Sequence, residues 1–224
     1  MDHVQVTVST SPDGEETNLP VKLAYLNSAL QTGTRSPIDA SIVDYASART
    51  GQDQHADDAE GGIGEEIRIE QWEKLGEVPF DSTRRLLSVL VARSRSGVDE
   101  KGFLITKGAV EEVLDRCTRI YDHTSSVYLD DFKLGTDRTS SLTTDRRGQI
   151  LRRAERFNSD GLRLVAVACK SAVAMPSMSV TRVDEADLVF IGFLGFLDPL
   201  KPDAADAIGR LAELGVQVRH TFYF

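Results

Sequence analysis

The longest apolar run of the chain, Leu188 to Leu197, restricts its possible folds more than any other segment. The run has about half the length that a membrane-spanning helix needs. An apolar segment this short is typical of a buried strand, which Gly192 and Gly195 are expected to interrupt. No basic segment followed by an apolar one opens the chain. We therefore expect a buried sheet, and neither a signal peptide nor a membrane anchor within this sequence.

Four further segments have the composition of strands. Residues 4–8 alternate with period two and contain β-branched side chains, as a strand with one buried face does. Residues 86–91, 103–106 and 162–169 are more uniformly apolar, so we expect those strands to be buried. A glycine-containing turn at 97–100 is predicted to join two of them.

The spacing of apolar residues also predicts helices. They cover residues 20–31, a segment that begins at Ser36-Pro37, and residues 109–119, 144–159 and 203–214. Residues 67–74 fit either a short helix or a short strand, with Trp72 as a core side chain. Residues 50–64 are rich in Gly, Asp and Glu, which is typical of a solvated loop.

The charge and the cysteines exclude several classes of protein. A net charge of −9 over 224 residues opposes general binding to nucleic acid or to anionic membranes, so any phosphate site must be local. Cys117 and Cys169 lack metal-type spacing and lie in apolar runs, which suits free thiols in a reducing compartment. We expect a cytosolic chain dominated by one domain.

The C-terminal part is organised differently from the rest. After the apolar run, Asp198-Pro199 marks a turn, a helix follows, and Val216-Gln217-Val218 starts another strand. This order is that of a βαβ unit, which needs a parallel sheet to pack on. We therefore predict a main domain at residues 1–196 and a fragment of a second domain at residues 197–224.

Phe80 stands between Pro79 and Asp81, just before the strand predicted at 86–91. Two interpretations are open for it. It could be a core side chain, or a platform for a nucleotide base, a contact worth ~1–3 kcal/mol in nucleic-acid complexes. Arg84 and Arg85 follow, and adjacent arginines are commonly solvated. Because an apolar strand begins directly behind them, one of the two is expected near the rim of the sheet.

Lys107-Gly108 joins a predicted strand to a predicted helix. A glycine there lets the backbone approach a ligand closely, and the lysine supplies a compact charge for phosphate. The spacing of a Walker-type loop is absent. Arg163 opens another buried strand, where its charge needs a partner, either a carboxylate such as Asp81 or a bound phosphate.

Asp39 lies in the first turn of the helix that starts at Ser36-Pro37. A carboxylate in this position interacts favourably with the helix dipole by up to ~1 kcal/mol, which gives it a structural role. The four histidines are scattered, and no nucleophile–base set or metal-ligand cluster is visible. The chemistry of the sequence therefore points to ligand binding rather than to catalysis.

Taken in order, four motifs of the chain resemble the nucleotide-binding domain of P-type cation-transporting ATPases. They are Pro79-Phe80-Asp81 with Arg84-Arg85, Lys107-Gly108-Ala109 with Glu112, Gly161-Leu162-Arg163, and Phe196-Leu197-Asp198-Pro199. Residues 24–28, 31–33 and 37–40 most resemble the magnesium-transporting branch. The resemblance spans nearly the whole chain.

The resemblance implies an α+β fold, with a mainly antiparallel sheet flanked by helices, that presents Mg-ATP to a separate phosphorylation domain. The residues that it implies for nucleotide binding are Asp39, Phe80, Asp81, Arg85, Lys107, Gly108 and Arg163. By motif position, Phe80 stacks on the adenine, and Lys107 and Gly108 line the adenine pocket. The two arginines of the set neutralise phosphates, and Asp39 matches an acidic residue near the base.

The chain departs from the family pattern where catalysis is concerned. It lacks the Asp-Lys-Thr-Gly-Thr phosphorylation motif, the Thr-Gly-Asp motif, the later Asp-rich hinge motif and membrane helices. Thr32-Gly33-Thr34 echoes the first motif but follows Leu30-Gln31, and Leu200 stands where the family usually has a second proline. We therefore expect ATP binding without hydrolysis or transport by this chain.

These expectations place the chain on the cytoplasmic side of an integral membrane pump. Its partners would be ATP and the phosphorylation and actuator domains of that pump, with no nucleic acid and no membrane insertion of its own, and the chain would be monomeric. One rival is a degenerate interaction protein that keeps the fold without binding nucleotide. Another is an independent phosphatase or kinase, which the lack of a phosphoacceptor and of a metal-holding Asp pair opposes.

Overall fold

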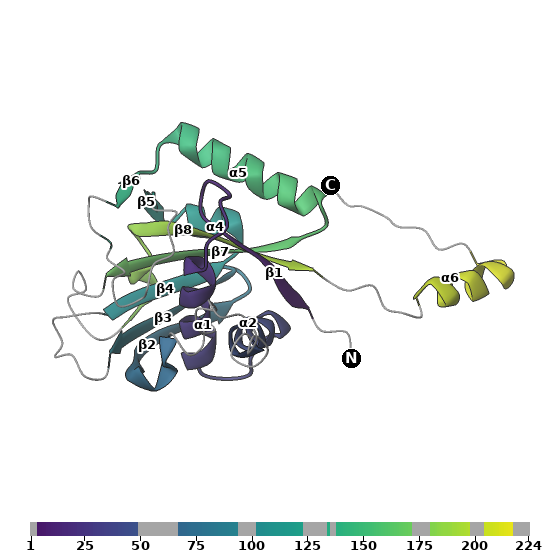
Figure 1. Ribbon diagram of the computed structural model, residues 1–224, viewed down its shortest axis with the longest axis horizontal. Helices are drawn as coiled ribbons and strands as arrows, with labels where there is room; N and C mark the ends of the chain where they lie inside the picture. The colour runs from purple at the N-terminus through teal and green to yellow at the C-terminus, as the bar shows by residue number, and fades with distance from the viewer. Residues whose placement is uncertain are drawn as a thin grey trace, which may run out of the picture.

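The computed structural model describes residues 4–48, 67–93, 102–122, 134, 138–171, 180–197 and 204–216. Within them, a mixed sheet is flanked by helices (Figure 1). The strands are β1 (Gln5–Thr10), β2 (Trp72–Asp81), β3 (Leu86–Arg93), β4 (Gly102–Gly108), β5 (Cys117–Tyr121), β6 (Thr139–Ser141), β7 (Arg163–Ser171) and β8 (Leu188–Leu197). The helices are α1 (Leu19–Leu30), α2 (Pro37–Ala48), α4 (Val110–Leu114), α5 (Thr144–Ser159) and α6 (Ala204–Glu213), with short 3₁₀ turns η1 (Ile69–Gln71) and η3 (Arg182–Asp184).

The apolar strand β8 lies at the centre of the sheet. The strand order is β2-β3-β4-β7-β8-β5-β6, and β1 pairs with the C-terminal half of β8, from Thr10 opposite Phe193 to Gln5 opposite Leu197. The pairing of β5 with β8 is parallel, whereas the other strand pairs of the described residues are antiparallel. The α+β fold with a mainly antiparallel sheet is therefore confirmed, with one parallel pair added.

Two apolar layers cover the two faces of the sheet. Helices α1 and α2 lie over one face and α5 over the other (Figure 1). Leu23 and Leu26 of α1 pack with Val89 of β3 in the first layer, whereas Ile150 and Ala154 of α5 belong to the second. Because successive residues of a strand point to opposite faces, the central strands must be apolar throughout, as their sequences are.

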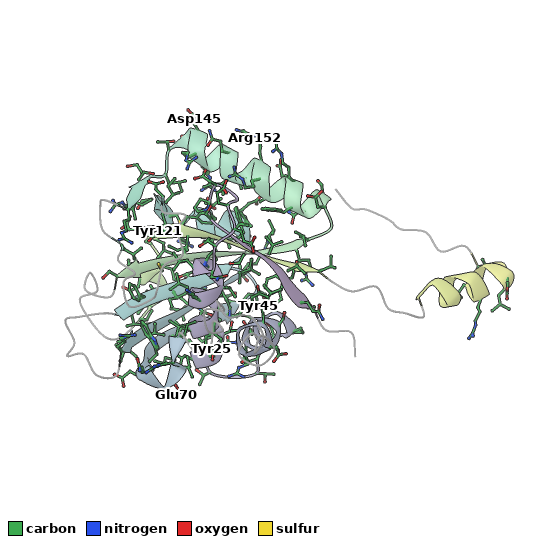
Figure 2. The ribbon with its side chains drawn as sticks, viewed as in Figure 1. Tyr25, Tyr45, Glu70, Tyr121, Asp145 and Arg152 are labelled. Carbon is green, nitrogen blue, oxygen red and sulfur yellow. The ribbon has the colours of Figure 1, made fainter. Side chains whose placement is uncertain are left out.

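Helix α5 and strand β8 have the bounds predicted from the sequence. The Thr143 hydroxyl caps α5 by accepting from the Arg146 amide at 3.3 Å, and the chain leaves the helix through Gly161, whose φ is +85°. Figure 2 shows Asp145 and Arg152 on the side of α5 that points away from the sheet. The buried Ile150 and Ala154 occupy its inner side.

The prediction of a helix over residues 109–119 is wrong beyond Leu114. Helix α4 ends at Leu114, and Cys117 begins strand β5, which pairs with Leu188 of β8. Cys117 is buried as the first residue of this strand. The predicted helix would have buried it as well. Burial at that position could not distinguish the two structures, and the pairing with β8 decided between them.

The segment 67–74, left open by the sequence, contains both structures. A single 3₁₀ turn at Ile69–Gln71 leads into β2, whose first residue, Trp72, pairs with Arg93 of β3. Trp72 is buried, as predicted, and its indole nitrogen donates to the Ile67 carbonyl at 3.2 Å. Phe80 therefore lies near the end of β2 and not, as predicted, at the entrance of the following strand.

The glycines of β8 do not interrupt it, contrary to the prediction. Gly192 has a φ of +152°, and a side chain there would meet the Thr10 carbonyl oxygen at 1.9 Å. Glycine is required at this position because β1 passes directly against it. The strand remains continuous from Leu188 to Leu197.

Several predictions fall on other parts of the chain. The loop 50–64, the turn 97–100, the motif around Asp198-Pro199 and residues 217–218 lie outside the described residues. The helix predicted at 203–214 is present as α6, but the domain boundary at 196/197 stays a prediction. In the part of the chain that the structure describes, no helix combines the length and the apolar character needed to cross a membrane.

Candidate functional site

A pocket of about 320 Å³ opens on the face of the sheet that α1 and α2 cover. Its polar walls come from the connection between these helices and from β2, and apolar side chains complete it. The lining residues are Gln31, Thr32, Thr34, Ser36, Ile38, Asp39, Glu77, Pro79, Phe80, Leu87, Lys107, Gly108 and Val165. Four residues predicted to bind nucleotide, Asp39, Phe80, Lys107 and Gly108, thus line one cavity.

Phe80 projects from an irregularity in β2. Val78 pairs with Ser88 and Asp81 pairs with Leu86, so two residues of β2 stand opposite one residue of β3. Such a bulge redirects side chains, and here the consecutive residues Pro79 and Phe80 both line the pocket. The Phe80 side chain is 61% exposed, which excludes the interpretation as a core residue.

Lys107 is buried on the pocket side of β4. Its ammonium group forms an ion pair with Asp39 and donates to the Ser28 hydroxyl. Burial lowers the pKa of Lys107 to about 8, although the Asp39 carboxylate acts in the opposite direction. The lysine expected to grip phosphate is therefore already paired with a carboxylate inside the protein.

Asp39 has two structural functions at once. Its carboxylate accepts from the Ser36 amide at 3.1 Å and from the Ser36 hydroxyl at 2.7 Å, while its own amide donates to that hydroxyl at 3.2 Å. This reciprocal arrangement caps α2. Burial by itself would raise the pKa of Asp39, but the charge of Lys107 and the hydrogen bonds from Lys107 and Ser36 hold it at about 2. Asp39 therefore joins the helix end to the pocket.

Gly108 is required by packing within the protein. A Cβ at this position would lie 2.2 Å from the Arg85 carbonyl oxygen and 2.8 Å from the Leu86 side chain. The sequence predicts close approach of a ligand as the reason for this glycine. Its more direct cause is the contact between the end of β4 and the turn before β3, which also brings the Gly108 backbone to the pocket.

The remaining three predicted residues lie outside the set that lines the pocket. Arg85 is 58% exposed on its side chain and forms an ion pair with Glu112 of α4 at 2.8 Å. The Asp81 carboxylate forms ion pairs with Arg182 at 2.9 Å and with Arg84 at 3.7 Å. Arg163 is exposed at the first residue of β7, on the same face as the pocket residue Val165 two positions later.

Sequence reasoning missed a polar cluster on the pocket wall. Glu77 accepts from the Thr32 amide at 2.8 Å and from its hydroxyl, and Lys74 pairs with Glu77 at 3.0 Å. Burial acts to raise the pKa of Glu77, but the hydrogen bonds from Thr32 and the nearby Lys74 lower it. Glu77 precedes Pro79 by two residues in a strand, so alternation along β2 could have identified it.

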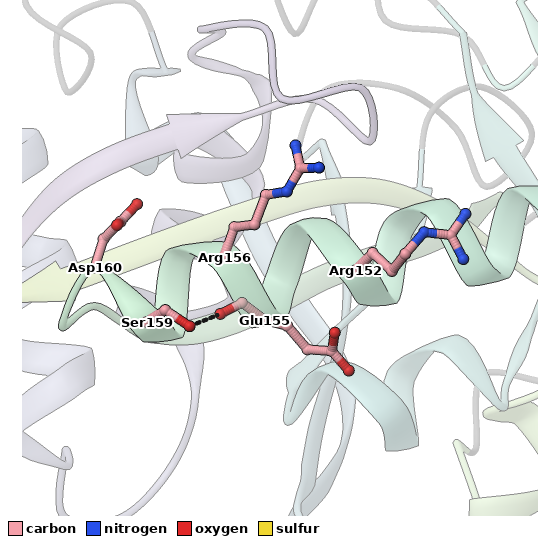
Figure 3. A pocket seen from close by; sticks show the side chains of 5 residues that line it. All are labelled: Arg152, Glu155, Arg156, Ser159 and Asp160. Carbon is pink, nitrogen blue, oxygen red and sulfur yellow. Dashed lines mark hydrogen bonds between the residues drawn. The ribbon is translucent and has the colours of Figure 1, made fainter.

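A second hollow, of about 470 Å³, lies along α5 on the other side of the sheet (Figure 3). Its lining residues are Arg152, Glu155, Arg156, Ser159 and Asp160, which are all exposed. Figure 3 shows the two arginines pointing to a different side from Glu155, with a hydrogen bond from the Ser159 hydroxyl to the Glu155 carbonyl at 2.9 Å. No apolar residue of the described chain lines this hollow, whereas Ile38, Leu87 and Val165 line the pocket beside Phe80, which is therefore the stronger candidate. In the described residues, no group of three or more His, Cys, Asp or Glu could hold a metal ion.

Comparison with known proteins shows the family of the chain. The family described as P-type ATPase, cytoplasmic domain N, matches residues 32–203. A magnesium-transporting ATPase, P-type 1, of Salmonella typhimurium strain 14028s is 33% identical over 218 residues, which are 97% of this chain and 21% of that protein. The protein of the same name from Escherichia coli K12 is 30% identical over 220 residues, again 97% of this chain and 21% of the relative.

A more distant relative is a calcium-transporting ATPase of Bacillus subtilis, 30% identical over 158 residues, which cover 70% of this chain and 16% of that protein. The chain thus spans about a fifth of the length of the magnesium-transporting relatives. The match to most of the chain, together with a mixed sheet covered by helices on both faces, shows that the chain belongs to the family of cytoplasmic N domains of P-type ATPases.

Proposed function

We propose that this chain is the ATP-binding module of a magnesium-transporting P-type ATPase. In this proposal it holds ATP for transfer of the terminal phosphoryl group to an aspartate in a separate phosphorylation domain. The names of the relatives support the transported ion, and the pocket beside Phe80 supports the nucleotide. The phosphorylation and actuator domains of the same pump would be its partners.

The exposed ring of Phe80 carries the proposal. A large aromatic side chain that is 61% exposed yet borders a pocket has an unused face on which a base can stack. Leu87 and Val165 add apolar surface to the same cavity. Its volume of about 320 Å³ is at the lower end of the range for small-molecule sites, ~300–1,000 Å³. The cavity therefore suits a base with part of its sugar, and the phosphates would extend beyond it.

The charges divide the proposed site into two parts. Inside the pocket, Lys107 is balanced by Asp39, and Glu77 is balanced by Lys74, so the walls offer donors and acceptors without a strong net charge. A neutral polar wall suits the edge of a base better than a triphosphate. The phosphates would instead meet Arg85 and Arg163, which are both exposed at the surface of the domain.

One observation favours the rival function, a binding module that no longer takes nucleotide. Lys107 is paired with Asp39 and Arg85 with Glu112, so both cations already have carboxylate partners. An exposed pair such as Arg85–Glu112 contributes ~0–1 kcal/mol, however, and can be exchanged for phosphate at little cost. The rival predicts no response to several millimolar ATP together with a measurable complex with a phosphorylation domain.

A titration with ATP followed by NMR tests the proposal. We expect affinity on the order of millimolar, ~4 kcal/mol, with chemical-shift changes at Phe80, Lys107 and Gly108. Phe80→Ala removes the stacking surface and should weaken binding by ~1–3 kcal/mol, or about 5- to 150-fold. Leu214→Ala is the control, because Leu214 is likewise exposed, at 79%, and follows α6. Shifts confined to other residues, or unchanged binding by Phe80→Ala, would overturn the proposal.

A further inference from the structure

The bulge that carries Phe80 is held from the opposite face of the sheet by a buried polar network. Glu185, directly after η3, is fully buried. One of its carboxylate oxygens forms an ion pair with Arg84, and the other accepts from the Ser88 hydroxyl at 2.6 Å. The Ser88 and Thr106 hydroxyls are 2.8 Å apart, which extends the network to β4. We call Arg84 and Glu185 the clamp.

The clamp reaches the backbone next to Phe80. The Arg84 guanidinium donates to the Pro79 carbonyl at 2.7 Å while it pairs with Glu185. Pro79 lies in the bulge, where the regular ladder between β2 and β3 is interrupted. Arg84 therefore supplies a donor to a carbonyl at the irregular position, and its side chain is only 10% exposed.

The residue on the other side of Phe80 is fixed as well. The Asp81 carboxylate accepts from the Thr83 amide at 2.8 Å and from the Arg182 guanidinium at 2.9 Å. Arg182 and Glu185 belong to the same short segment, at η3. One segment on the far face thus restrains both neighbours of Phe80, through Arg182 on one side and through the clamp on the other.

We infer that Arg84 and Glu185 are positioning residues, which fix the ring of Phe80 at the pocket. A ring that is 61% exposed has little packing of its own to hold it, so its place depends on the backbone on either side. A general contribution to stability explains the clamp less well, because well-packed apolar residues of similar volume often stabilise a fold as much as a buried ion pair does. The inference rests on the proposed function where it concerns ATP, whereas the effect on Phe80 itself is independent of any ligand.

The test uses the double substitution Arg84→Met with Glu185→Leu, which removes the clamp without leaving one buried charge alone. We expect its dissociation constant for ATP to rise about 10-fold, since part of the stacking is lost. In a Phe80→Ala background the same double substitution should change ATP binding less than about twofold, because the clamp acts through Phe80. A folded double variant with unchanged ATP binding, or an effect that adds fully to that of Phe80→Ala, overturns the inference.

A conservative variant separates positioning from stability. Arg84→Lys keeps a charge for Glu185 but lacks the planar fork that also reaches the Pro79 carbonyl. It should unfold near the wild-type midpoint yet bind ATP about 3-fold more weakly. The control is Arg146→Met with Asp13→Leu, which removes a more exposed two-point arginine–carboxylate pair, at 2.9 and 3.0 Å, between α5 and the turn after β1. That control should bind ATP as the wild type does, and equal weakening in both double variants would contradict positioning.

The same variants distinguish a failure of the inference from a failure of the proposed function. If the wild type shows no response to ATP, the nucleotide site is wrong, and the clamp is then judged from spectra without ligand. There, the clamp double variant should shift the ring signals of Phe80 and the amide of Asp81, and the control double variant should leave both unchanged. Unaltered Phe80 signals in a folded clamp double variant overturn the inference whether or not ATP binds.

Discussion

Two buried ion pairs lie on opposite faces of the same two strands. Leu87 of β3 pairs with Lys107 of β4, and the next position pairs Ser88 with Thr106. Lys107 points to the pocket and binds Asp39, whereas Ser88 points to the other face and binds Glu185, the partner of Arg84. Because strand residues alternate between faces, adjacent positions serve two different networks.

The two pairs differ in what surrounds them. Lys107 and Asp39 both belong to the residues that line a cavity of about 320 Å³. Glu185 is fully enclosed and meets only protein groups, among them the side chain that holds the Pro79 carbonyl. Burial of an ion pair thus does not by itself reveal a binding site. The pair at a cavity is a candidate for ligand contact, and the enclosed pair is a candidate for holding the backbone in place.

Breaking the enclosed pair should have the largest effect. Glu185→Leu leaves Arg84 buried without its main carboxylate and deprives the Ser88 hydroxyl of an acceptor. We expect the free energy of unfolding to fall by about 3–5 kcal/mol in urea titrations at neutral pH. Adding Arg84→Met should restore much of this loss. A change below about 1 kcal/mol in the single variant would show that the pair is solvated, which would remove the contrast.

Breaking the pair at the cavity should cost less. Lys107→Met leaves Asp39 without its cation, but Asp39 keeps the hydrogen bonds from Ser36 and lies beside the pocket. We expect a loss of about 2–3 kcal/mol at neutral pH. The pKa of Asp39 should rise from about 2 toward its ordinary value of 3.8, because burial remains and the balancing charge is gone. Carbonyl-detected NMR titration of the Asp39 side chain would measure it, and a pKa that stays near 2 would contradict the ion pair.

Lowering the pH should have the smallest effect on the free energy of unfolding when the Asp39–Lys107 pair is intact. The pKa of Asp39 in the folded protein, about 2, lies below its ordinary value of 3.8, so the unfolded chain binds this proton more readily. The resulting stabilisation, about 2 kcal/mol, is fully present above about pH 4 and is lost as the pH falls through 2. Urea titrations at pH 5, 3 and 2 would follow it. Asp39→Asn provides the control, since its stability should lack this component of the pH dependence.

The sequence predicted which residues line the pocket better than it predicted how they interact. Phe80 and Lys107 were singled out because one stood beside a proline in an irregular segment and the other ended an apolar strand. Their convergence depends on the bulge at Pro79-Phe80 and on the register of β3 against β4. Neither is encoded in a short stretch, because register is fixed by pairing between segments far apart in the chain.

The same limit explains the errors. Residues 117–121 form a strand because β8 offers them an edge, although helical spacing continues as far as Cys117. Gly192 was predicted to break a strand, and Gly108 to allow contact with a ligand. Each is instead required because another backbone segment passes within van der Waals distance of it. Glu185 attracted no attention, since a single acidic residue before a strand has no pattern that marks it as buried.

The sequence by itself determined the α+β composition, the bounds of α5 and β8, the candidate residues of the pocket and the resemblance to P-type ATPases. These depend on local patterns of apolar, capping and turn residues, which short segments contain in full. Only the tertiary structure decided that Lys107 is paired with Asp39, that Phe80 is exposed on a bulge, and that Arg84 and Glu185 support that bulge from behind. Those facts arise from contacts between residues up to about a hundred positions apart, which exist only once the sheet has formed.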